Sequence, residues 1–341
     1  MAPPAANQGS APHTRLQRAG DLAARLGSLQ PSDPNFRRGL HAGIAIVLIL
    51  GLGLAVFGAV GKWPDVDWTF RPAWLAVGVI GMTIFLIANG EIWRRLLHAL
   101  GPELAPRPAM AIWFTSNLGR YVPAAALLPL LRVAMAEREG VPKRICLASV
   151  VYEVALFFVA SLLLGAYFVI DLPALQGHWQ RFLVMVLPLV GLIALHPRVF
   201  HTFADAALER LGRARLPLSL PAGRVLEFVA MFAATFVIAG LAVYALAKLV
   251  YPVTGDDLVT FIGAFAVGTA LSVLAFFLPG GVVARELGLA LALAPVMPTA
   301  PAIAIAVLVR IAQISLELAL VGLTQLLVRA GTSESETAPP G

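Results

Sequence analysis

The sequence predicts an all-α membrane protein: a polytopic helix bundle with about six spans and two re-entrant helical hairpins, arranged as an inverted repeat. Three observations lead to this prediction. The 341 residues are 59% hydrophobic and only 13% charged, with a mean hydropathy of +0.83, which excludes an ordinary soluble domain. Several apolar segments are long enough to cross a bilayer core of about 30 Å. Two further apolar segments are interrupted by glycine and proline and carry an arginine.

The two ends of the chain differ in composition from its apolar middle. We expect a flexible cytoplasmic tail over residues 1–36, a single transmembrane domain over 37–330 and a flexible C-terminal tail over 331–341. The N-terminal tail contains no apolar run of the kind that forms the core of a signal peptide. The net charge of +6 reflects the Lys and Arg that membrane proteins concentrate in cytoplasmic loops, so it does not indicate nucleic-acid binding.

The first half begins with two predicted spans, residues 40–60 and 72–92. Several arginines precede the first span, and the short loop after it contains acidic as well as basic residues. The positive-inside rule therefore places the N-terminus in the cytoplasm. The second span returns the chain to the cytoplasmic side at Arg94 and Arg95.

The apolar segment 109–131 contains the first break. Gly119 and Pro123 argue against one smooth helix, since proline lacks a backbone donor, and Arg120 lies between them. Basic residues precede and follow the segment, so it should enter and leave by the cytoplasmic side, as a re-entrant hairpin does. A charge at this depth is expected to face a protein interior or a water-filled cavity and to serve as a functional site.

Three spans are expected to follow, and the first of them bears a glutamate, Glu153. Their ranges are 146–170, 182–195 and 226–249. The loop between the second and third of these spans is basic, so it is expected to lie in the cytoplasm. The third span then ends on the outer side.

A second broken element lies near the end of the chain. It is either a hairpin that dips in from the outer side or a full span followed by a return. Its two apolar segments are 258–278 and 282–296, and its hinge consists of Pro279, Gly280 and Gly281.

Charged side chains follow the hinge and occupy the last span, 302–328. Arg285 and Glu286 are adjacent, so on a helix they diverge by about 100° and are not expected to pair with each other. A polar stripe in the last span must face protein or water, because its members share one helical face. The stripe consists of Arg310, Gln313 and Glu317.

The two halves of the chain therefore share a plan. Each contains a broken apolar element with an arginine, followed by a spanning helix with a buried glutamate. If the first broken element enters the membrane from the cytoplasmic side and the second from the outer side, the two halves form an inverted repeat. Interrupted segments at corresponding positions of two halves point to a transporter's binding site near the membrane midplane.

Two motifs resemble those of a known family. The first is the run Gly-Arg-Tyr-Val-Pro at 119–123, followed by Arg132 and Glu153; the second is Pro-Gly-Gly at 279–281, followed by Arg285 and Glu286. Over about residues 40–330 the chain is similar to the lysylphosphatidylglycerol synthase transmembrane family. Members are also described as flippase-like, and include the flippase half of the bacterial multiple-peptide-resistance factor and relatives associated with hopanoid and glycosylated polyprenol lipids. The resemblance implies two re-entrant elements that face each other across a lipid-binding cavity.

Arginines are the expected ligands of a lipid phosphate, because a guanidinium group suits paired phosphate oxygens. The residues predicted to bind the phosphate or line the cavity are Asn117, Arg120, Tyr121, Arg132, Arg285 and Arg310. Carboxylates are predicted to balance these charges or to couple transport to protons, and they are Glu153, Glu286 and Glu317. The alternative is a set of ion pairs that only stabilises the fold, with the Asn and Tyr side chains satisfying the broken backbone.

Signatures of catalysis and metal binding are sparse in the sequence. The histidines lie in loops or at span ends without metal-ligand spacing, and no Gly-Lys-Ser/Thr phosphate loop occurs. The single cysteine, Cys146, cannot form an intrachain disulfide. We therefore expect no catalytic residue, no metal and no cofactor. The one enzyme-like feature is the acidic pair Asp65 and Asp67 in an outer loop, where lipid-linked glycosyltransferases hold a divalent metal.

These features together predict a lipid flippase of the bacterial inner membrane, with both termini in the cytoplasm. Its lipid would be anionic or amphipathic, of the phospholipid, aminoacylated phospholipid, hopanoid or polyprenyl-phosphate type. Two alternatives stay open: a membrane-embedded enzyme, such as a lipid-linked glycosyl- or headgroup transferase, and a scaffold of a lipid-synthesis complex. The expected partners are membrane lipids and not nucleic acid, while homo-oligomerisation and association with lipid-synthesis enzymes stay open.

Overall fold

The computed structural model describes residues 70–121, 127–170, 180–196, 220–275 and 284–337, together with residues 199 and 202. Every regular element in these ranges is a helix. Several predicted features lie outside the described residues. These are the N-terminal tail 1–36, the first span 40–60, the acidic pair at 65 and 67, Pro123, and the hinge of Pro279, Gly280 and Gly281.

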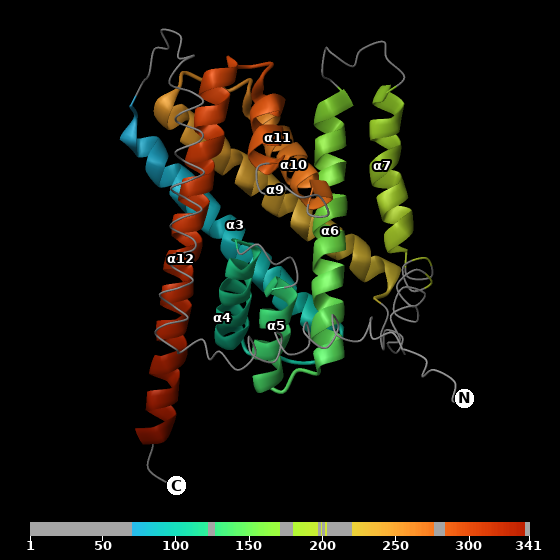
Figure 1. Cartoon of the computed structure of the whole chain (residues 1–341), viewed down its shortest axis with the longest axis vertical. Helices are drawn as coiled ribbons and strands as arrows, with labels where there is room; N and C mark the ends of the chain where they lie inside the picture. The colour runs from blue at the N-terminus through green and yellow to red at the C-terminus, as the bar shows by residue number, and fades with distance from the viewer. Residues whose placement is uncertain are drawn as a thin grey trace, which may run out of the picture.

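Four long helices form the frame of the bundle (Figure 1). They are α3 (Pro72–Ala99), α6 (Lys143–Ile170), α9 (Ala222–Val250) and α12 (Thr299–Thr337). Shorter helices lie between them: α4 (Pro106–Asn117), the 3-10 turn η1 (Leu118–Tyr121), α5 (Leu127–Arg138), α10 (Leu258–Ala275) and α11 (Ala284–Leu293). Helix α7 (Gln180–Leu195) packs along α6.

Within the described ranges, five helices are long and apolar enough to cross a membrane: α3, α6, α9, α10 and α12. This confirms the prediction of an all-α, multi-pass membrane protein. The predicted span 182–195 falls in α7, which has 16 residues and is shorter than the roughly 20 residues that a span needs. Helix α12 continues to Thr337, past residue 330, where the C-terminal tail was expected to begin.

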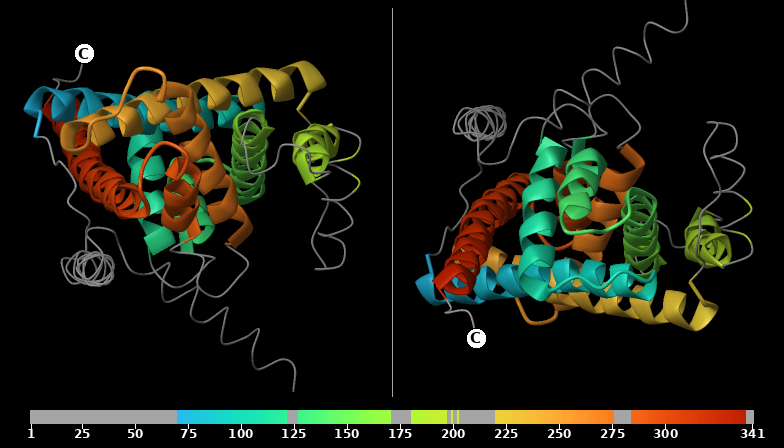
Figure 2. Two further views of the ribbon diagram at one scale, coloured as in Figure 1. Left: turned by 90° about the horizontal axis from the view of Figure 1, so that it is seen from above. Right: turned by 90° about the horizontal axis from the view of Figure 1, so that it is seen from below.

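The first broken element contains two helices, α4 and α5, as expected, and a 3-10 turn follows the first of them. Helix α4 ends at Asn117, and the chain then tightens into η1. Gly119 permits a close approach at this turn, because a β-carbon there would lie 2.8 Å from the backbone nitrogen of Leu128 in α5. The view from below in Figure 2 shows α4 and α5 side by side at that end of the molecule.

The second broken element, α10 with α11, lies in the opposite half of the bundle (Figure 1). The two helices pack through glycine: a β-carbon on Gly268 would lie 2.8 Å from the carbonyl oxygen of Arg285, and one on Gly288 would lie 3.0 Å from the Cα of Gly268. Their backbones are therefore nearly in contact. The location of the two broken elements in opposite halves fits an inverted repeat, and the repeat itself stays a prediction.

A group of phenylalanine rings joins four helices in the core. The ring of Phe85 in α3 packs edge-on against Phe265 in α10, with 5.5 Å between centroids. Phe236 in α9 lies 5.9 Å from Phe265 and 4.7 Å from Phe157 in α6. Helices α3 and α9 also meet at their ends, where the backbone N–H of Arg71 donates to the carbonyl of Leu249 (3.0 Å). Helix α12 does not contribute to this group of rings and lies along another side of the bundle (Figure 2).

A close helix approach in this core should not tolerate an added methyl group. A β-carbon at Gly240 in α9 would lie 2.4 Å from the Cα of Ile262 in α10. We expect Gly240→Ala to destabilise the protein by about 1–3 kcal/mol, because overpacking forces the helices apart. Thermal unfolding of the detergent-solubilised protein measures the effect.

Gly322 in α12 provides the control, because a β-carbon there would meet nothing within 4 Å. Gly322→Ala should leave the melting temperature unchanged or raise it, since alanine favours the helix. Equal melting temperatures for the two variants would contradict the close α9–α10 contact.

Candidate functional site

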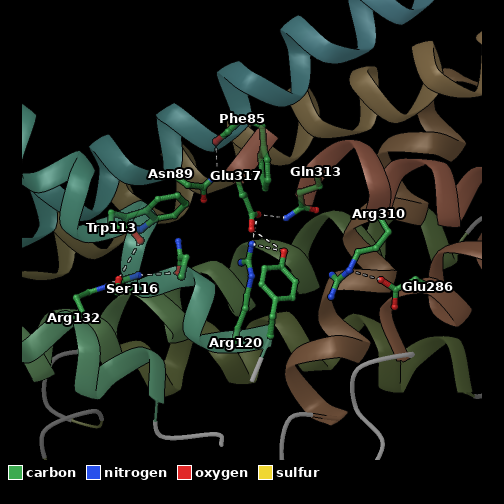
Figure 3. A network of polar contacts seen from close by, with 12 residues as sticks. Phe85, Asn89, Trp113, Ser116, Arg120, Arg132, Glu286, Arg310, Gln313 and Glu317 are labelled. Carbon is green, nitrogen blue, oxygen red and sulfur yellow. Dashed lines mark hydrogen bonds and ion pairs between the residues drawn. The ribbon is translucent and has the colours of Figure 1, made fainter. Parts of the chain in front are cut away.

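Charged side chains gather at two places inside the apolar bundle (Figure 3). We call the first the anchor network, and it consists of Trp113, Ser116, Asn117, Arg132 and Glu153. The second is the central cluster, and it consists of Arg120, Tyr121, Arg285, Glu286, Arg310, Gln313 and Glu317. In the described part of the chain, no group of three or more His, Cys, Asp or Glu side chains is placed to hold a metal ion.

Arg132 in α5 is the centre of the anchor network, and only 1% of its side chain is exposed. Its Nε donates to the hydroxyl of Ser116 (2.9 Å), and one terminal nitrogen donates to the Oδ1 of Asn117 (3.0 Å). The other terminal nitrogen donates to Glu153 in α6, forming an ion pair. Glu153 accepts a second hydrogen bond from the indole N–H of Trp113 (2.7 Å).

Two indole rings enclose the same guanidinium group. The Cζ of Arg132 lies 5.0 Å from the ring centroid of Trp93 and 5.9 Å from that of Trp113, distances that suit cation–π contacts. Every guanidinium nitrogen therefore has an acceptor, and the charge is balanced by Glu153. The network links α5 to α4 and α6, so in this structure Arg132 stabilises the packing of these helices. The sequence predicts it instead as one of the headgroup ligands.

The central cluster begins with an ion pair between Arg120 in η1 and Glu317 in α12. The hydroxyl of Tyr121 donates to the Oε2 of Glu317 (2.7 Å), and the amide nitrogen of Gln313 donates to its Oε1 (2.7 Å). Glu317 is only 1% exposed and has three donors, as a buried carboxylate requires. The side chain of Arg120, in contrast, is 34% exposed.

Tyr121 connects this ion pair to a second one. The Cζ atoms of Arg120 and Arg310 lie 5.2 Å and 5.1 Å from the centroid of its ring. The Nε of Arg310 lies 3.3 Å from the Oε1 of Glu286, in the first turn of α11. Helix α12 thus contacts the first broken element through Glu317 and the second through Arg310 (Figure 3).

Arg285 is the cation of the cluster without a carboxylate partner among the described residues. Its Cζ lies 4.8 Å from the ring centroid of Phe265, a distance that suits a cation–π contact. With Glu286 and Arg310 it borders a small pocket with room for about one water molecule. Three arginines and two glutamates leave the described cluster with one positive charge in excess.

The structure brings the predicted site residues together in two groups. Glu317 pairs with Arg120, as the predicted charge balancing requires. Glu153 is also predicted to balance the phosphate-binding arginines, and it pairs with Arg132. Proton coupling by Glu153 stays a prediction. Arg310 shares the face of α12 with Glu317, as the spacing predicts, and Glu286 pairs with Arg310 rather than with its neighbour in the sequence.

The sequence analysis named Asn117 and Glu153 as site residues, but it missed three other residues that surround the buried arginine, Trp93, Trp113 and Ser116. Trp113, Ser116 and Asn117 lie at helical spacings of three and four, so their spacing places them on one face of α4 and was an available signal. Trp93 of α3 offers no such signal, because its place beside Arg132 depends on how the helices pack.

Residues 40–321 match the family model described as "Lysylphosphatidylglycerol synthase TM region". This range includes every residue of the anchor network and of the central cluster. No curated protein and no solved structure gives a significant match to the chain.

Removing one charge from the anchor network should be costly. Arg132→Met leaves the largely buried carboxylate of Glu153 without its cation, and we expect a loss of about 3–5 kcal/mol in unfolding free energy. The double variant Arg132→Met with Glu153→Gln should recover part of this loss, because the stranded charge is gone. A double-mutant cycle on denaturation in detergent measures the coupling.

The control is Arg95→Met, which breaks a surface pair with Glu91 whose arginine is 56% exposed. It should cost about 0–1 kcal/mol. Strict additivity of the two anchor substitutions would show that the pair does not act as a unit.

Proposed function

The chain belongs to the lysylphosphatidylglycerol synthase transmembrane family, and from that premise we propose that it is a lipid translocase of the bacterial inner membrane. The headgroup of an anionic or amphipathic lipid crosses through the central cluster while the acyl tails stay in the bilayer. The chain transports the lipid and changes none of its bonds. Both termini lie in the cytoplasm, in keeping with the basic segments that flank the predicted spans.

The excess positive charge of the central cluster is the observation that supports this proposal. An unbalanced guanidinium group in hydrocarbon costs about 2.5 kcal/mol or more, so such a group needs a functional reason. A lipid phosphate supplies the missing negative charge, and its paired oxygens match the fork of an arginine. The cluster therefore fits an anion that is bound during transport and released afterwards.

The position of the arginines supports movement of that anion. Arg120 belongs to the first broken element and Arg285 to the second, and α12 lies between the two through its contacts with both. A phosphate that leaves Arg120 is therefore still attracted electrostatically by Arg285. Glu317 returns to Arg120 when the phosphate has moved on, which keeps the arginine from being left unpaired.

The anchor network complements this exchange by keeping the first broken element rigid. Arg132 holds α5 to α4 and α6 through three hydrogen-bonded partners. The tip residue Arg120 shares none of these partners, so it can exchange Glu317 for a phosphate without loosening the hairpin.

Loss of Arg120 should abolish most of the transport. In proteoliposomes that contain acyl-labelled fluorescent phospholipids or polyprenyl phosphates, we expect Arg120→Gln to slow translocation by about 10- to 100-fold. This range corresponds to the loss of one hydrogen bond between charged groups, about 1.5–3 kcal/mol. The rate at which labelled lipid becomes accessible to a membrane-impermeant quencher measures translocation.

Arg224→Gln is the matched control, because Arg224 forms an exposed pair with Glu227 away from the cluster. It should translocate like the wild type. Unchanged transport by Arg120→Gln would refute the assigned site, and absence of transport by folded wild-type protein would refute the translocase. Activity in cells that depends on Asp65 and not on Arg120 would favour the enzyme instead.

A further inference from the structure

We propose that the central cluster selects a headgroup that is a singly charged phosphodiester bearing hydroxyl groups. The inference rests on the proposed function and concerns which lipid the same site accepts. Two features support it: the net charge of the cluster and two buried hydrogen-bond acceptors that have no donor within the described ranges.

The charge of the cluster favours an anion with a single negative charge. Arg120 and Arg310 are each paired with a glutamate, and Arg285 is the remaining cation. A phosphodiester neutralises this one charge. A phosphomonoester, with up to two negative charges, adds an uncompensated anion, and a zwitterionic headgroup leaves the cation uncompensated.

The first unpartnered acceptor is the amide oxygen of Gln313, a residue that is 2% exposed. The orientation of this amide follows from its neighbour. The carboxylate of Glu317 can only accept hydrogen bonds, so Gln313 turns its nitrogen toward Glu317 and its oxygen away. Figure 3 shows that oxygen on the side of the amide nearer to Arg310.

The second unpartnered acceptor is the Oε2 of Glu286, whose other oxygen pairs with Arg310. Glu286 borders the pocket between Arg285 and Arg310. The pocket holds about one water molecule as it stands, so its side chains must move apart to admit a phosphate between those two arginines, which would bring the phosphate's substituent beside the free oxygen of Glu286. Gln313 lies three residues after Arg310, on the same face of α12, and offers the next acceptor.

Only some headgroups can satisfy these acceptors. A fully ionised bare phosphate brings only acceptors, so it leaves both oxygens without a donor. An ammonium group brings donors together with a positive charge, close to Arg285 and Arg310. Hydroxyl groups supply donors without charge, so a polyol or sugar attached to the phosphate fits the cluster.

This chemistry can come from two kinds of lipid, a glycerophospholipid or a glycosyl phosphodiester of a polyprenol. Two matched pairs of labelled lipids distinguish them in wild-type proteoliposomes. Phosphatidylglycerol and phosphatidylpropanol have equal charge and differ in their hydroxyls, and polyprenyl phosphoglucose is compared with polyprenyl phosphate. We expect the hydroxylated member of at least one pair to move about tenfold faster, the effect of one lost hydrogen bond to a charged group.

Substitutions that keep the side-chain shape test the charge. Glu286→Gln raises the excess charge from one to two and should shift the preference about tenfold from phosphatidylglycerol toward phosphatidate. Arg285→Gln removes the excess and should shift the preference toward phosphatidylethanolamine. Glu227→Gln, at an exposed pair, should change neither preference.

The possible outcomes separate the inference from the proposed function. Equal rates within both lipid pairs would overturn the hydroxyl requirement while leaving the translocase in place. Unchanged preferences in whichever of the two variants elutes as folded protein would overturn the charge matching. Absence of transport of all these lipids by the wild type would overturn the proposed function, and the inference with it.

Discussion

A guanidinium group in the interior of a membrane protein needs an anion, and much of this structure depends on how that need is met. Arg132 meets it with Glu153, which fixes α5 against α6. Arg120 meets it with Glu317, which fixes the tip of the first broken element against α12. Because hydrocarbon offers neither water nor counterions, each of these pairs determines where a helix can lie.

The two arginines of the first broken element show that burial alone does not define a binding residue. Arg132 has an acceptor for each guanidinium nitrogen, two indole rings beside it and almost no exposed surface, so a ligand would find nothing to bind. Arg120 keeps a third of its side chain exposed and shares Glu317 with two other donors. A carboxylate with three donors can lose one and stay solvated by the others. Incomplete coordination is therefore what separates the candidate site from the scaffold.

Most of the helical framework could be predicted from the sequence, because the length and apolarity of a membrane helix are local properties. The common face of Arg310 and Glu317 was predictable for the same reason, since helical spacing sets it. The partners of the charges were not predictable. Glu153 follows Arg120 by 33 residues and Arg132 by 21 residues, and nothing in the spacing shows that it pairs with the second of them. That choice depends on how the helices cross, which is set by contacts between distant segments such as the glycines of α10 and α11.

The separation of the ion-pair partners along the chain has a consequence for biogenesis. Arg132 and Glu153 lie 21 positions apart, so their pair can form as soon as α6 follows α5 out of the ribosome. Arg120 and Glu317 lie 197 positions apart, and synthesis proceeds from the N-terminus. The first broken element is therefore synthesised before Glu317 is available to its tip. The ion pair between Arg120 and Glu317 can form only after α12 is made, so the last helix completes an assembly that the first half begins.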